Sequence, residues 1–479
     1  MTAIKSYYGG AYRDGAQHTF DKVYPATGDV IGQVELATAE MLDEAVAMAH
    51  EAQKPWAKRS VQDRGQILIK CAHALREAND ELSRLEVQDV GKVFAEAVSA
   101  DVPSGPDVLE FMGAAIMTYH GTQHQWPGAI GFTRRIPLGV CAGIGAWNYP
   151  VQIALWKSSP ALAMGNAFIL KPSEMTPLSA LKIVEIMEDA GLPKGLLNVM
   201  QGDYTMGSAI CRHPDIAKVS LTGGVETGKK IMAQSADSLK RVTLELGGKA
   251  PLILFDDCDL DKATTTAMEA NFYTAGEVCS NATRVFVHRP IADEILSRMK
   301  SMTDAMTVGD PMADDVQMGA LISEQHLQKV LNYVDQGVAE GAELITGGER
   351  VRPQGFENGF FMRPTILSGC QDDMAVVREE IFGPVMSVLI FDDEEEAVRR
   401  ANETHFGLGA GLFTRDLTRA HRVADALEAG NVWINTYNLI PPDMPFGGVK
   451  QSGFGRESSH YAFEAYSDVR ATYIALDDD

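Results

Sequence analysis

The sequence lacks paired cysteines. Its 479 residues include six cysteines, and no two of them are close enough to form a C-x-x-C pair. Disulfide frameworks and zinc sites use numerous or closely spaced cysteines, so this scatter indicates reduced thiols and predicts no metal site. The six are Cys71, Cys141, Cys211, Cys258, Cys279 and Cys370.

Long apolar runs are also absent. No stretch approaches the roughly 20 apolar residues that a helix needs to cross a bilayer. The first residues, Met1 to Ser6, contain no apolar core of a signal peptide. The sequence therefore predicts a cytoplasmic protein with no membrane partner.

Positive charge is scarce. The chain has 42 lysines and arginines against 65 aspartates and glutamates, for a formal net charge of −23. Binding to a phosphate backbone requires a basic surface, so this balance argues against a nucleic-acid partner. The excess of acid favours solubility and is compatible with a cationic substrate.

The dinucleotide fingerprint G-x-G-x-x-G is missing, and Gly143-Ile144-Gly145 matches only part of it. Strands and helices nevertheless alternate from residue 138 to the helix that follows the turn at 222–228, which predicts a parallel sheet with a ligand at the carboxyl ends of its strands. Gly223, Gly224 and Gly228 follow one such strand. Their turn either presents backbone N–H groups to a pyrophosphate or is an ordinary glycine-rich connection.

Local patterns predict the neighbouring elements. Residues 23–34 resemble a hairpin, and helix-like spacing continues until proline and glycine interrupt it at 102–106. A helix should begin at Pro150 and kink or end at Pro160. The other predicted helices are 38–58, 64–78 after a cap at Ser60, 80–92, 108–119, 178–190, 260–273 and 291–306. A chain of this length is too long for one core, so two or three domains are expected.

Two stretches carry candidate chemistry. Cys279 stands on a turn of small residues before an apolar strand, where it is either a nucleophile or a buried structural thiol. Glu245 stands inside an apolar strand, just before Gly247 and Gly248. A buried carboxylate is costly, and desolvation raises its pKa toward that of a general base.

These two stretches, LELGGK at residues 244–249 and GEVCSNATR at residues 276–284, resemble motifs of the aldehyde dehydrogenase superfamily. The resemblance covers nearly the whole chain. It implies that Cys279 attacks the aldehyde, that Asn148 and the Cys279 backbone N–H stabilise the resulting alkoxide, and that Glu245 activates the water that hydrolyses the thioester. The resemblance implies that Lys171 is both a catalytic and a cofactor-binding residue.

The resemblance also implies NAD as the cofactor. The carboxylate of Glu174 would repel a 2′-phosphate, which favours NAD over NADP. The residues expected to bind the cofactor are Ile144, Trp147, Lys171, Ser173, Glu174, Gly202, Gly223, Gly224, Gly228, Leu246, Glu380 and Phe382.

Four aromatic residues stand beside the motifs: Tyr149, Trp156, Tyr273 and Phe446. Each could pack a core, but together they resemble the aromatic box of relatives that oxidise trimethylammonium aldehydes. The expected substrate is a small cationic aldehyde, with betaine aldehyde first and 4-trimethylaminobutyraldehyde or another aminoaldehyde as the alternatives. Transfer of the thioester to coenzyme A, ester hydrolysis at Cys279 and a non-catalytic role are rival hypotheses, which the presence of Asn148, Glu245 and Cys279 disfavours.

The expected fold is α/β, with a Rossmann-like NAD-binding domain, a second α/β catalytic domain and a small β segment for oligomerisation. The resemblance assigns residues 1–118 and 138–248 to NAD binding and 249–448 to catalysis. Residues 119–137 and 460–479 would form the oligomerisation segments of a homotetramer or homodimer.

Overall fold

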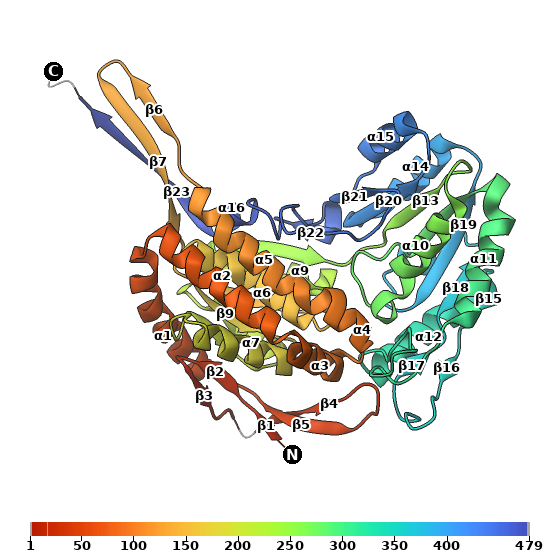
Figure 1. The fold of residues 1–479 in the computed structure, drawn as a ribbon, viewed down its shortest axis with the longest axis horizontal. Helices are drawn as coiled ribbons and strands as arrows, with labels where there is room; N and C mark the ends of the chain where they lie inside the picture. The colour runs from red at the N-terminus through yellow and green to blue at the C-terminus, as the bar shows by residue number, and fades with distance from the viewer. Residues whose placement is uncertain (1, 17, 477–479) are drawn as a thin grey trace.

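The computed structural model describes residues 2–16 and 18–476, and these residues form two main sheets (Figure 1). The first sheet has eight described strands. In sheet order they are β22 (Gly453–Phe454), β12 (Arg241–Leu246), β11 (Ile216–Gly223), β8 (Val140–Ile144), β9 (Ala167–Lys171), β10 (Leu197–Val199), β2 (Ser6–Tyr8) and β3 (Ala11–Arg13). The central strands β12, β11, β8, β9 and β10 are parallel, as their alternation with helices predicts.

Helices cover this sheet and bury a continuous apolar core. Helices α6 and α7 contact β8, β9 or β10, and α2, α3 and α5 pack against them. Helix α1 contacts β8, β9 and β10, whereas α8 contacts β11 and α9 contacts β11 and β12. Their bounds are α1 (Ala39–Lys58), α2 (Val61–Glu77), α3 (Asn79–Val90), α5 (Val102–Ala115), α6 (Pro150–Ala163), α7 (Leu178–Asp189), α8 (Tyr204–Arg212) and α9 (Val225–Ser235).

The second sheet has seven described strands and a core on each face. In sheet order they are β15 (Glu343–Thr346), β18 (Thr365–Ser368), β19 (Val385–Phe391), β14 (Arg284–His288), β13 (Pro251–Leu254), β20 (Gly409–Phe413) and β21 (Asn431–Ile434). Successive residues of β14 alternate between the cores: Phe286 joins one cluster, whereas Val285 and Val287 join the other. The covering helices are α10 (Leu260–Phe272), α11 (Ala292–Ala305), α12 (Glu324–Ala339), α13 (Ala375–Arg378), α14 (Glu394–Asn402) and α15 (Leu417–Ala426).

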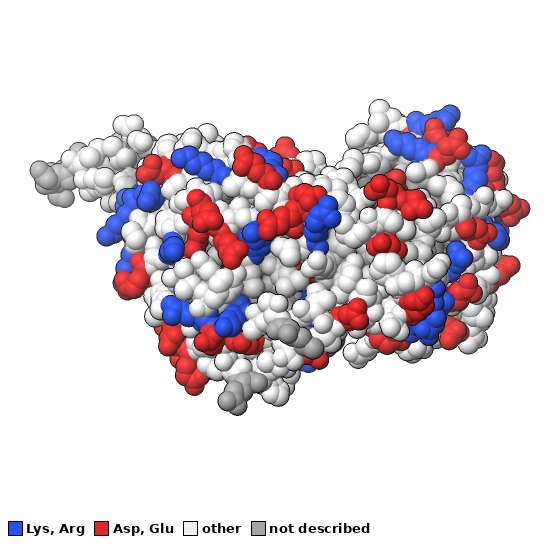
Figure 2. Space-filling model, turned by 60° about the horizontal axis from the view of Figure 1, so that its bottom comes forward, with Lys and Arg blue, Asp and Glu red and all other residues white. Residues whose placement is uncertain are grey.

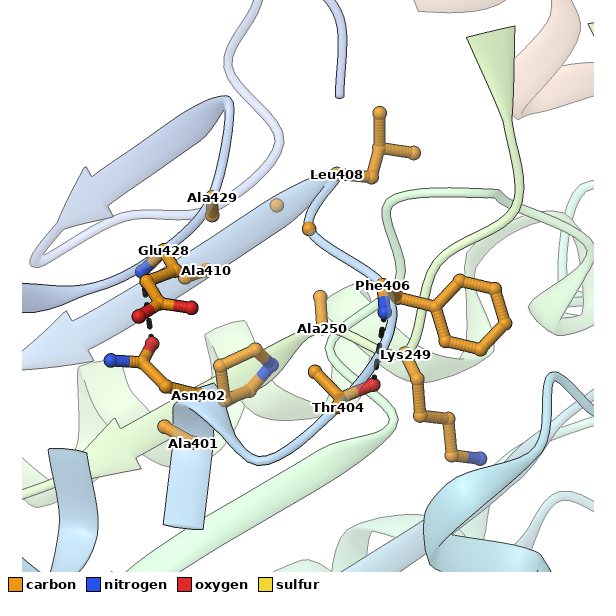
Figure 3. Close-up of a pocket in the computed structure, with 13 residues that line it drawn as sticks. Lys249, Ala250, Ala401, Asn402, Thr404, Phe406, Leu408, Ala410, Glu428 and Ala429 are labelled. Atoms are coloured by element: carbon orange, nitrogen blue, oxygen red, sulfur yellow. Dashed lines mark hydrogen bonds between the residues drawn. The ribbon is translucent and has the colours of Figure 1, made fainter. Parts of the chain in front are cut away.

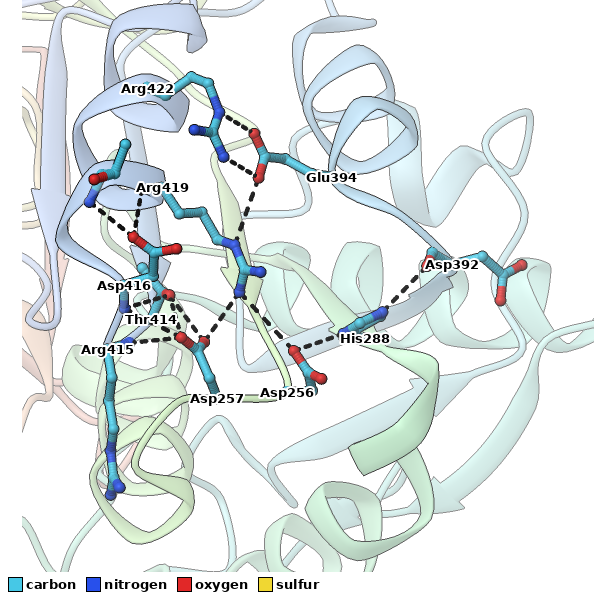
Figure 4. Close-up of polar contacts among 11 residues, drawn as sticks. Asp256, Asp257, His288, Asp392, Glu394, Thr414, Arg415, Asp416, Arg419 and Arg422 are labelled. Carbon is cyan, nitrogen blue, oxygen red and sulfur yellow. Dashed lines mark hydrogen bonds and ion pairs between the residues drawn. The ribbon is translucent and has the colours of Figure 1, made fainter.

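A polar cluster ties together loops at one end of the second sheet (Figure 4). Asp257, after β13, accepts hydrogen bonds from Thr414, after β20, at 2.8 Å and from Arg419 of α15 at 3.2 Å. Arg419 also lies 3.9 Å from Asp256, which pairs with His288 at 3.2 Å. These charges satisfy one another, so the cluster stabilises the loops.

A third sheet projects from the body as an arm (Figure 1). Strand β7 (Ala129–Pro137) lies between β6 (Gln123–Trp126) and β23 (Ser467–Ala475), and both pairings are antiparallel. These strands fall within the two segments predicted at 119–137 and 460–479, although residues 477–479 lie outside the described residues. The remaining elements are short: β1 (Thr2–Ile4), β4 (Thr19–Val23), β5 (Val30–Glu35), β16 (Arg350–Val351), β17 (Phe361–Met362), α4 (Phe94–Glu96) and α16 (Ala462–Ala465).

Two predictions about proline were wrong. The expected break at 102–106 is the beginning of α5, which follows a π-helical segment at Ala97–Asp101. Pro103 and Pro106 fall at the second and fifth positions of α5, where each removes at most one intrahelical hydrogen bond. Pro160 does not end α6, which continues to Ala163; almost all of that helix is buried, so tertiary packing outweighs the local cost.

On the face shown in Figure 2, acidic and basic side chains are intermingled. Within residues 2–16 and 18–476, no helix is both long enough and apolar enough to cross a membrane.

Candidate active site

A cavity of about 550 Å³ is lined by residues from the elements around both main sheets. Helices α5 and α6 contribute from the first, whereas α10 and the turn after it contribute from the second. Asn148, Glu245 and Cys279 all line this cavity. The structure therefore brings together three of the four residues expected to be catalytic, although they are far apart in the sequence. The fourth, Lys171, is not part of the lining of this cavity.

The turn that carries Cys279 has an unusual backbone. Thr274 and Ala275 both have φ of +49°, and Gly276 has φ of +74°. The Gly276 Cα packs against the backbone of Gly383, which leaves no room for a Cβ. Burial, followed by the charges of Glu380 and Glu245, raises the pKa of the Cys279 thiol to about 12. The thiol is therefore protonated near neutral pH unless a positive charge is brought beside it.

Asn148 is buried, with its amide directed at the nucleophile turn. Its Nδ2 donates to the backbone oxygen of Glu277 at 2.9 Å. An amide nitrogen carries two hydrogens, so this bond fixes the side chain and leaves the second N–H for another acceptor. An anchored donor next to the thiol suits the stabilisation of an alkoxide.

Glu245 lies near the carboxyl end of β12 and is 5% exposed. Neither of its carboxyl oxygens has a hydrogen-bond partner among the described residues. Burial, followed by the charge of Glu457, raises its pKa well above the usual range. Such a carboxylate is poorly solvated and accepts a proton readily, as a general base must.

No motif in the sequence predicted a role for Glu457, Ser220 or Lys157, which form a polar cluster near Glu245. The Glu457 carboxylate accepts a hydrogen bond from the Ser220 hydroxyl at 3.2 Å and forms a closer ion pair with Lys157. Lys157 also donates to the Ser220 hydroxyl at 3.0 Å, from a helix that is almost entirely buried. A lysine inside such an apolar helix was the one signal that could have indicated a buried partner.

A second depression, of about 530 Å³, lies at the carboxyl end of β11, and Gly224, Val225, Glu380 and His405 are part of its lining. Gly224 caps α9 and offers no side chain to that helix, so the N–H groups of its first turn are open to an anion. On the opposite side, Glu380 accepts the backbone N–H of Gly248 at 3.0 Å. Burial raises the pKa of Glu380 to about 7.

The other residues expected to bind NAD collect at the same edge of the sheet. Ile144, Lys171 and Leu246 lie at the ends of neighbouring strands, as does Gly223. The Lys171 ammonium donates to the Pro172 carbonyl at 2.7 Å and to Glu174 at 3.3 Å. An anion-accepting helix end, a buried lysine and a carboxylate at one edge of the sheet fit the phosphates and ribose hydroxyls of a dinucleotide.

Three more of the expected residues lie around this edge. Ser173 accepts the N–H of Met175 at 3.3 Å, which shapes the loop after β9. Gly202 lies in the turn after β10, against Met206, and Gly228 packs against Leu246. Beyond Glu380, the ring of Phe382 meets that of Trp147 edge to face at 5.2 Å.

The four aromatic residues expected around the substrate all line the cavity. Trp156 and Phe446 meet edge to face at 5.6 Å. The Tyr149 hydroxyl lies 2.9 Å from Thr274 Oγ1, and the Tyr273 hydroxyl donates to Asp101 at 2.8 Å. The structure adds Tyr437, which also lines the cavity and donates to the Ser280 carbonyl at 2.9 Å.

Tyr149 already has a cation on one of its faces. The ammonium of Lys92 lies 3.9 Å from the ring centroid. Lys92 is fully buried and pairs with Glu86 at 3.0 Å and Asp101 at 2.6 Å. A cationic ligand in the cavity therefore depends chiefly on the other rings.

A smaller pocket contains none of these side chains. Lys249, Asn402, Thr404 and Glu428 lie around a space of about 10 Å³ (Figure 3). It is too small for a substrate.

Comparison with known proteins decides the family. The model described as "Aldehyde dehydrogenase family" matches residues 12–472. The chain belongs to the aldehyde dehydrogenase family. This confirms the resemblance found in the motifs and the expectation of an aldehyde dehydrogenase.

Individual relatives agree with this result. A betaine aldehyde dehydrogenase from Sinorhizobium fredii is 53% identical over 97% of this chain and 95% of its own length. The NAD+ complex of an aldehyde dehydrogenase from Bacillus cereus superposes with a TM-score of 0.96 at 39% identity, covering 99% of this chain and 97% of that one. A betaine aldehyde dehydrogenase from Staphylococcus aureus, also in complex with NAD+, has a TM-score of 0.96 at 34% identity, covering 99% and 96%. The expected α/β fold of this aldehyde dehydrogenase is thereby confirmed.

Proposed function

We propose that this aldehyde dehydrogenase oxidises a small quaternary-ammonium aldehyde, betaine aldehyde first, to its carboxylate with NAD as the cofactor. The observation that carries the proposal is the acidic and aromatic character of the cavity. Its described lining contains five carboxyl side chains and no lysine, arginine or histidine. The five are Asp101, Asp107, Glu245, Glu269 and Glu457.

Charge and aromatic rings together suit a trimethylammonium group. Such a group has no hydrogen-bond donor, so ring faces and diffuse negative charge hold it better than a salt-bridging fork. The names of the relatives from Sinorhizobium fredii and Staphylococcus aureus support the same substrate. 4-Trimethylaminobutyraldehyde, or another aminoaldehyde, is the second candidate, because a cavity of about 550 Å³ also accommodates a longer chain.

Cys279, Asn148 and Glu245 would each have a separate role in the reaction. The Cys279 thiol loses its proton to solvent as its sulfur forms a bond to the aldehyde carbon, and the Asn148 amide and the Cys279 backbone N–H stabilise the resulting alkoxide. Bound NAD supplies the hydride acceptor. Glu245 then removes a proton from water, whose oxygen attacks the thioester carbon and releases the Cys279 sulfur.

The cofactor preference follows from the groove. Lys171 and Glu174 would hold the adenine ribose, and the Glu174 carboxylate would repel the 2′-phosphate of NADP. Ser173, Gly202, Gly223, Gly224 and Gly228 would line the path of the dinucleotide, and Glu380 and Phe382 would hold its nicotinamide half.

The domain assignment and assembly belong to this proposal. Residues 1–118 and 138–248 would bind NAD, and residues 249–448 would carry the catalytic thiol. The arm of β6, β7 and β23 would join subunits of a homotetramer or homodimer in the cytoplasm. Trp126, Val469 and Tyr473 of the arm are exposed, which favours cover by a second chain.

Matched substrates test the proposal. Betaine aldehyde is compared with 3,3-dimethylbutanal, in which carbon replaces the quaternary nitrogen, and 4-trimethylaminobutyraldehyde with 5,5-dimethylhexanal. If two or three rings each contribute about 0.5–2 kcal/mol, the cation should be preferred by tens-fold or more in kcat/KM. Equal values within either pair would refute a site for cations.

The rival activities are tested in the same assay. Free acid should be released without coenzyme A, because Glu245 supplies the hydrolytic base. Turnover of the aldehyde should require NAD. Acid formation that depended on coenzyme A, or on neither cofactor, would reject the hydrolytic dehydrogenase.

A further inference from the structure

His326 joins two parts of the active site that the motifs treat separately. It lies in the first turn of α12, outside every motif used above. Its Nε2 lies 2.6 Å from the backbone oxygen of Phe382. A carbonyl oxygen can only accept, so Nε2 carries the hydrogen and donates. Burial lowers the pKa of His326 to about 4, so the ring is neutral near pH 7.

The carbonyl that His326 binds belongs to a strained residue. Phe382 has φ of +62°, a conformation that bulky side chains rarely adopt and that the surroundings must hold in place. Helix α12 packs closely behind it, because a Cβ at Gly383 would lie 2.6 Å from Val330. His326 and Val330 are four residues apart and share one face of α12. This face of α12 therefore contacts both residues: His326 donates to Phe382, and Val330 packs against Gly383.

The start of α12 also holds the nucleophile turn. His326 Nε2 lies 3.6 Å from Glu277 Oε1, which accepts the N–H of Ile322 at 3.0 Å. Glu277 is fully buried and precedes Cys279 by two residues. Its backbone oxygen is the acceptor that anchors the Asn148 amide.

Trp147 closes the arrangement. Its ring meets His326 at 5.4 Å and Phe382 at 5.2 Å, both edge to face. Trp147 directly precedes Asn148. A shift of the His326 ring would therefore move Trp147, and with it the Asn148 amide, as well as Phe382.

We infer that His326 is a positioning residue, whose N–H holds the strained Phe382 loop in register with the turn that carries Cys279. The inference rests on the proposed function, in which Phe382 contacts the nicotinamide. Hydride transfer depends steeply on the separation of the reacting atoms, and a displacement of about 1 Å can cost 100-fold in rate. His326 contacts the Phe382 carbonyl and the Glu277 carboxylate, so its effect passes through these two residues.

Three substitutions separate the hydrogen bond from the packing. His326→Ala removes both, His326→Phe keeps a ring beside Trp147 without the N–H, and His326→Gln keeps an N–H donor without the ring. Gln325→Ala is the matched control, because Gln325 is the exposed neighbour on the same helix turn.

Two measurements on the full-length protein report the result. The first is the Kd for NAD, followed by the quenching of intrinsic fluorescence without any aldehyde. The second is the single-turnover rate of NADH formation from propanal at saturating NAD. We expect His326→Ala and His326→Phe to slow NADH formation by about 10-fold or more and to weaken NAD binding about 3-fold or more. His326→Gln should stay within about 3-fold of wild type, and Gln325→Ala within about 2-fold.

Either of two results would overturn the inference. One is a His326→Phe variant within twofold of wild type in both measurements, which would make the ring and not its N–H important. The other is an equal loss in His326→Gln and His326→Phe, which would indicate core packing alone. If His326→Ala fails to fold, the comparison of Phe with Gln still decides. Propanal carries no charge, so failure of the betaine-aldehyde proposal leaves this test unaffected.

Discussion

Replacement of Trp156 by alanine tests the aromatic part of the cavity most directly. The Trp156 side chain is 4% exposed, and its ring meets Phe446 at 5.6 Å. Loss of one ring face from around a cation costs about 0.5–2 kcal/mol. At about 1.4 kcal/mol per tenfold, this predicts a 2-fold to 30-fold loss of kcat/KM for betaine aldehyde. Oxidation of 3,3-dimethylbutanal should lose less, since no charge contacts the missing ring.

The assay must separate this loss from instability. Removing a buried tryptophan costs about 3–5 kcal/mol of folding free energy, so Tm should fall, and a loss of folded enzyme on purification would have no bearing on specificity. The ratio of kcat/KM for the two aldehydes, measured on one preparation, cancels the fraction of active enzyme. Trp156→Phe keeps a ring face and should retain more of the preference. Equal losses on both aldehydes would refute the reasoning and assign Trp156 to core packing.

Three further substitutions test individual roles. Cys279→Ala should abolish oxidation while the Kd for NAD changes little, and activity within a few-fold of wild type would exclude Cys279 as the nucleophile. Glu245→Gln should slow deacylation more than hydride transfer, which stopped-flow absorbance would show as an NADH burst before slow turnover; equal slowing would assign Glu245 to thiol activation. Asp101→Asn should reduce the preference for betaine aldehyde over its neutral isostere a few-fold and lower Tm, because Lys92 loses one of two carboxylate partners. An unchanged substrate ratio would remove Asp101 from the recognition of charge.

Local signals predicted much of the fold. The helix expected at 38–58 occurs at 39–58, because Thr38 caps it and the apolar spacing is regular. The strands around the cofactor groove were predicted because each is a short apolar run that alternates with a helix along the chain. The break predicted at 102–106 was wrong because a rule for isolated helices was applied at a helix start, where the preceding π-helical turn and the packing of α5 on α6 decide the outcome.

Residues of the candidate site were predicted only where a single motif in the sequence includes them. Cys279, Glu245 and Asn148 each stand in a recognisable stretch, and the structure gathers them around one cavity. Glu457 and Lys157 are 300 residues apart, so no local pattern could pair them. His326 is separated from Phe382 by 56 residues, and its contact depends on a backbone conformation that the sequence does not specify. Tertiary contacts between distant segments are thus what the sequence analysis missed.

The five carboxyl groups of the cavity connect substrate charge to the pH dependence of catalysis. Burial and the neighbouring Glu457 charge raise the pKa of Glu245, so its basic form accumulates only as pH rises. A trimethylammonium group in the same cavity is an opposite charge, which lowers the pKa of Glu245 and keeps the base deprotonated at lower pH. The pH profile of kcat for betaine aldehyde should therefore lie at lower pH than the profile for 3,3-dimethylbutanal, under conditions in which deacylation limits turnover. Glu245→Gln should abolish the difference, because it removes the titrating group. Superimposable profiles for the two aldehydes in the wild-type enzyme would show that the substrate cation lies too far from Glu245 to influence it, and the assignment of the ammonium group to this cavity would then have to be abandoned.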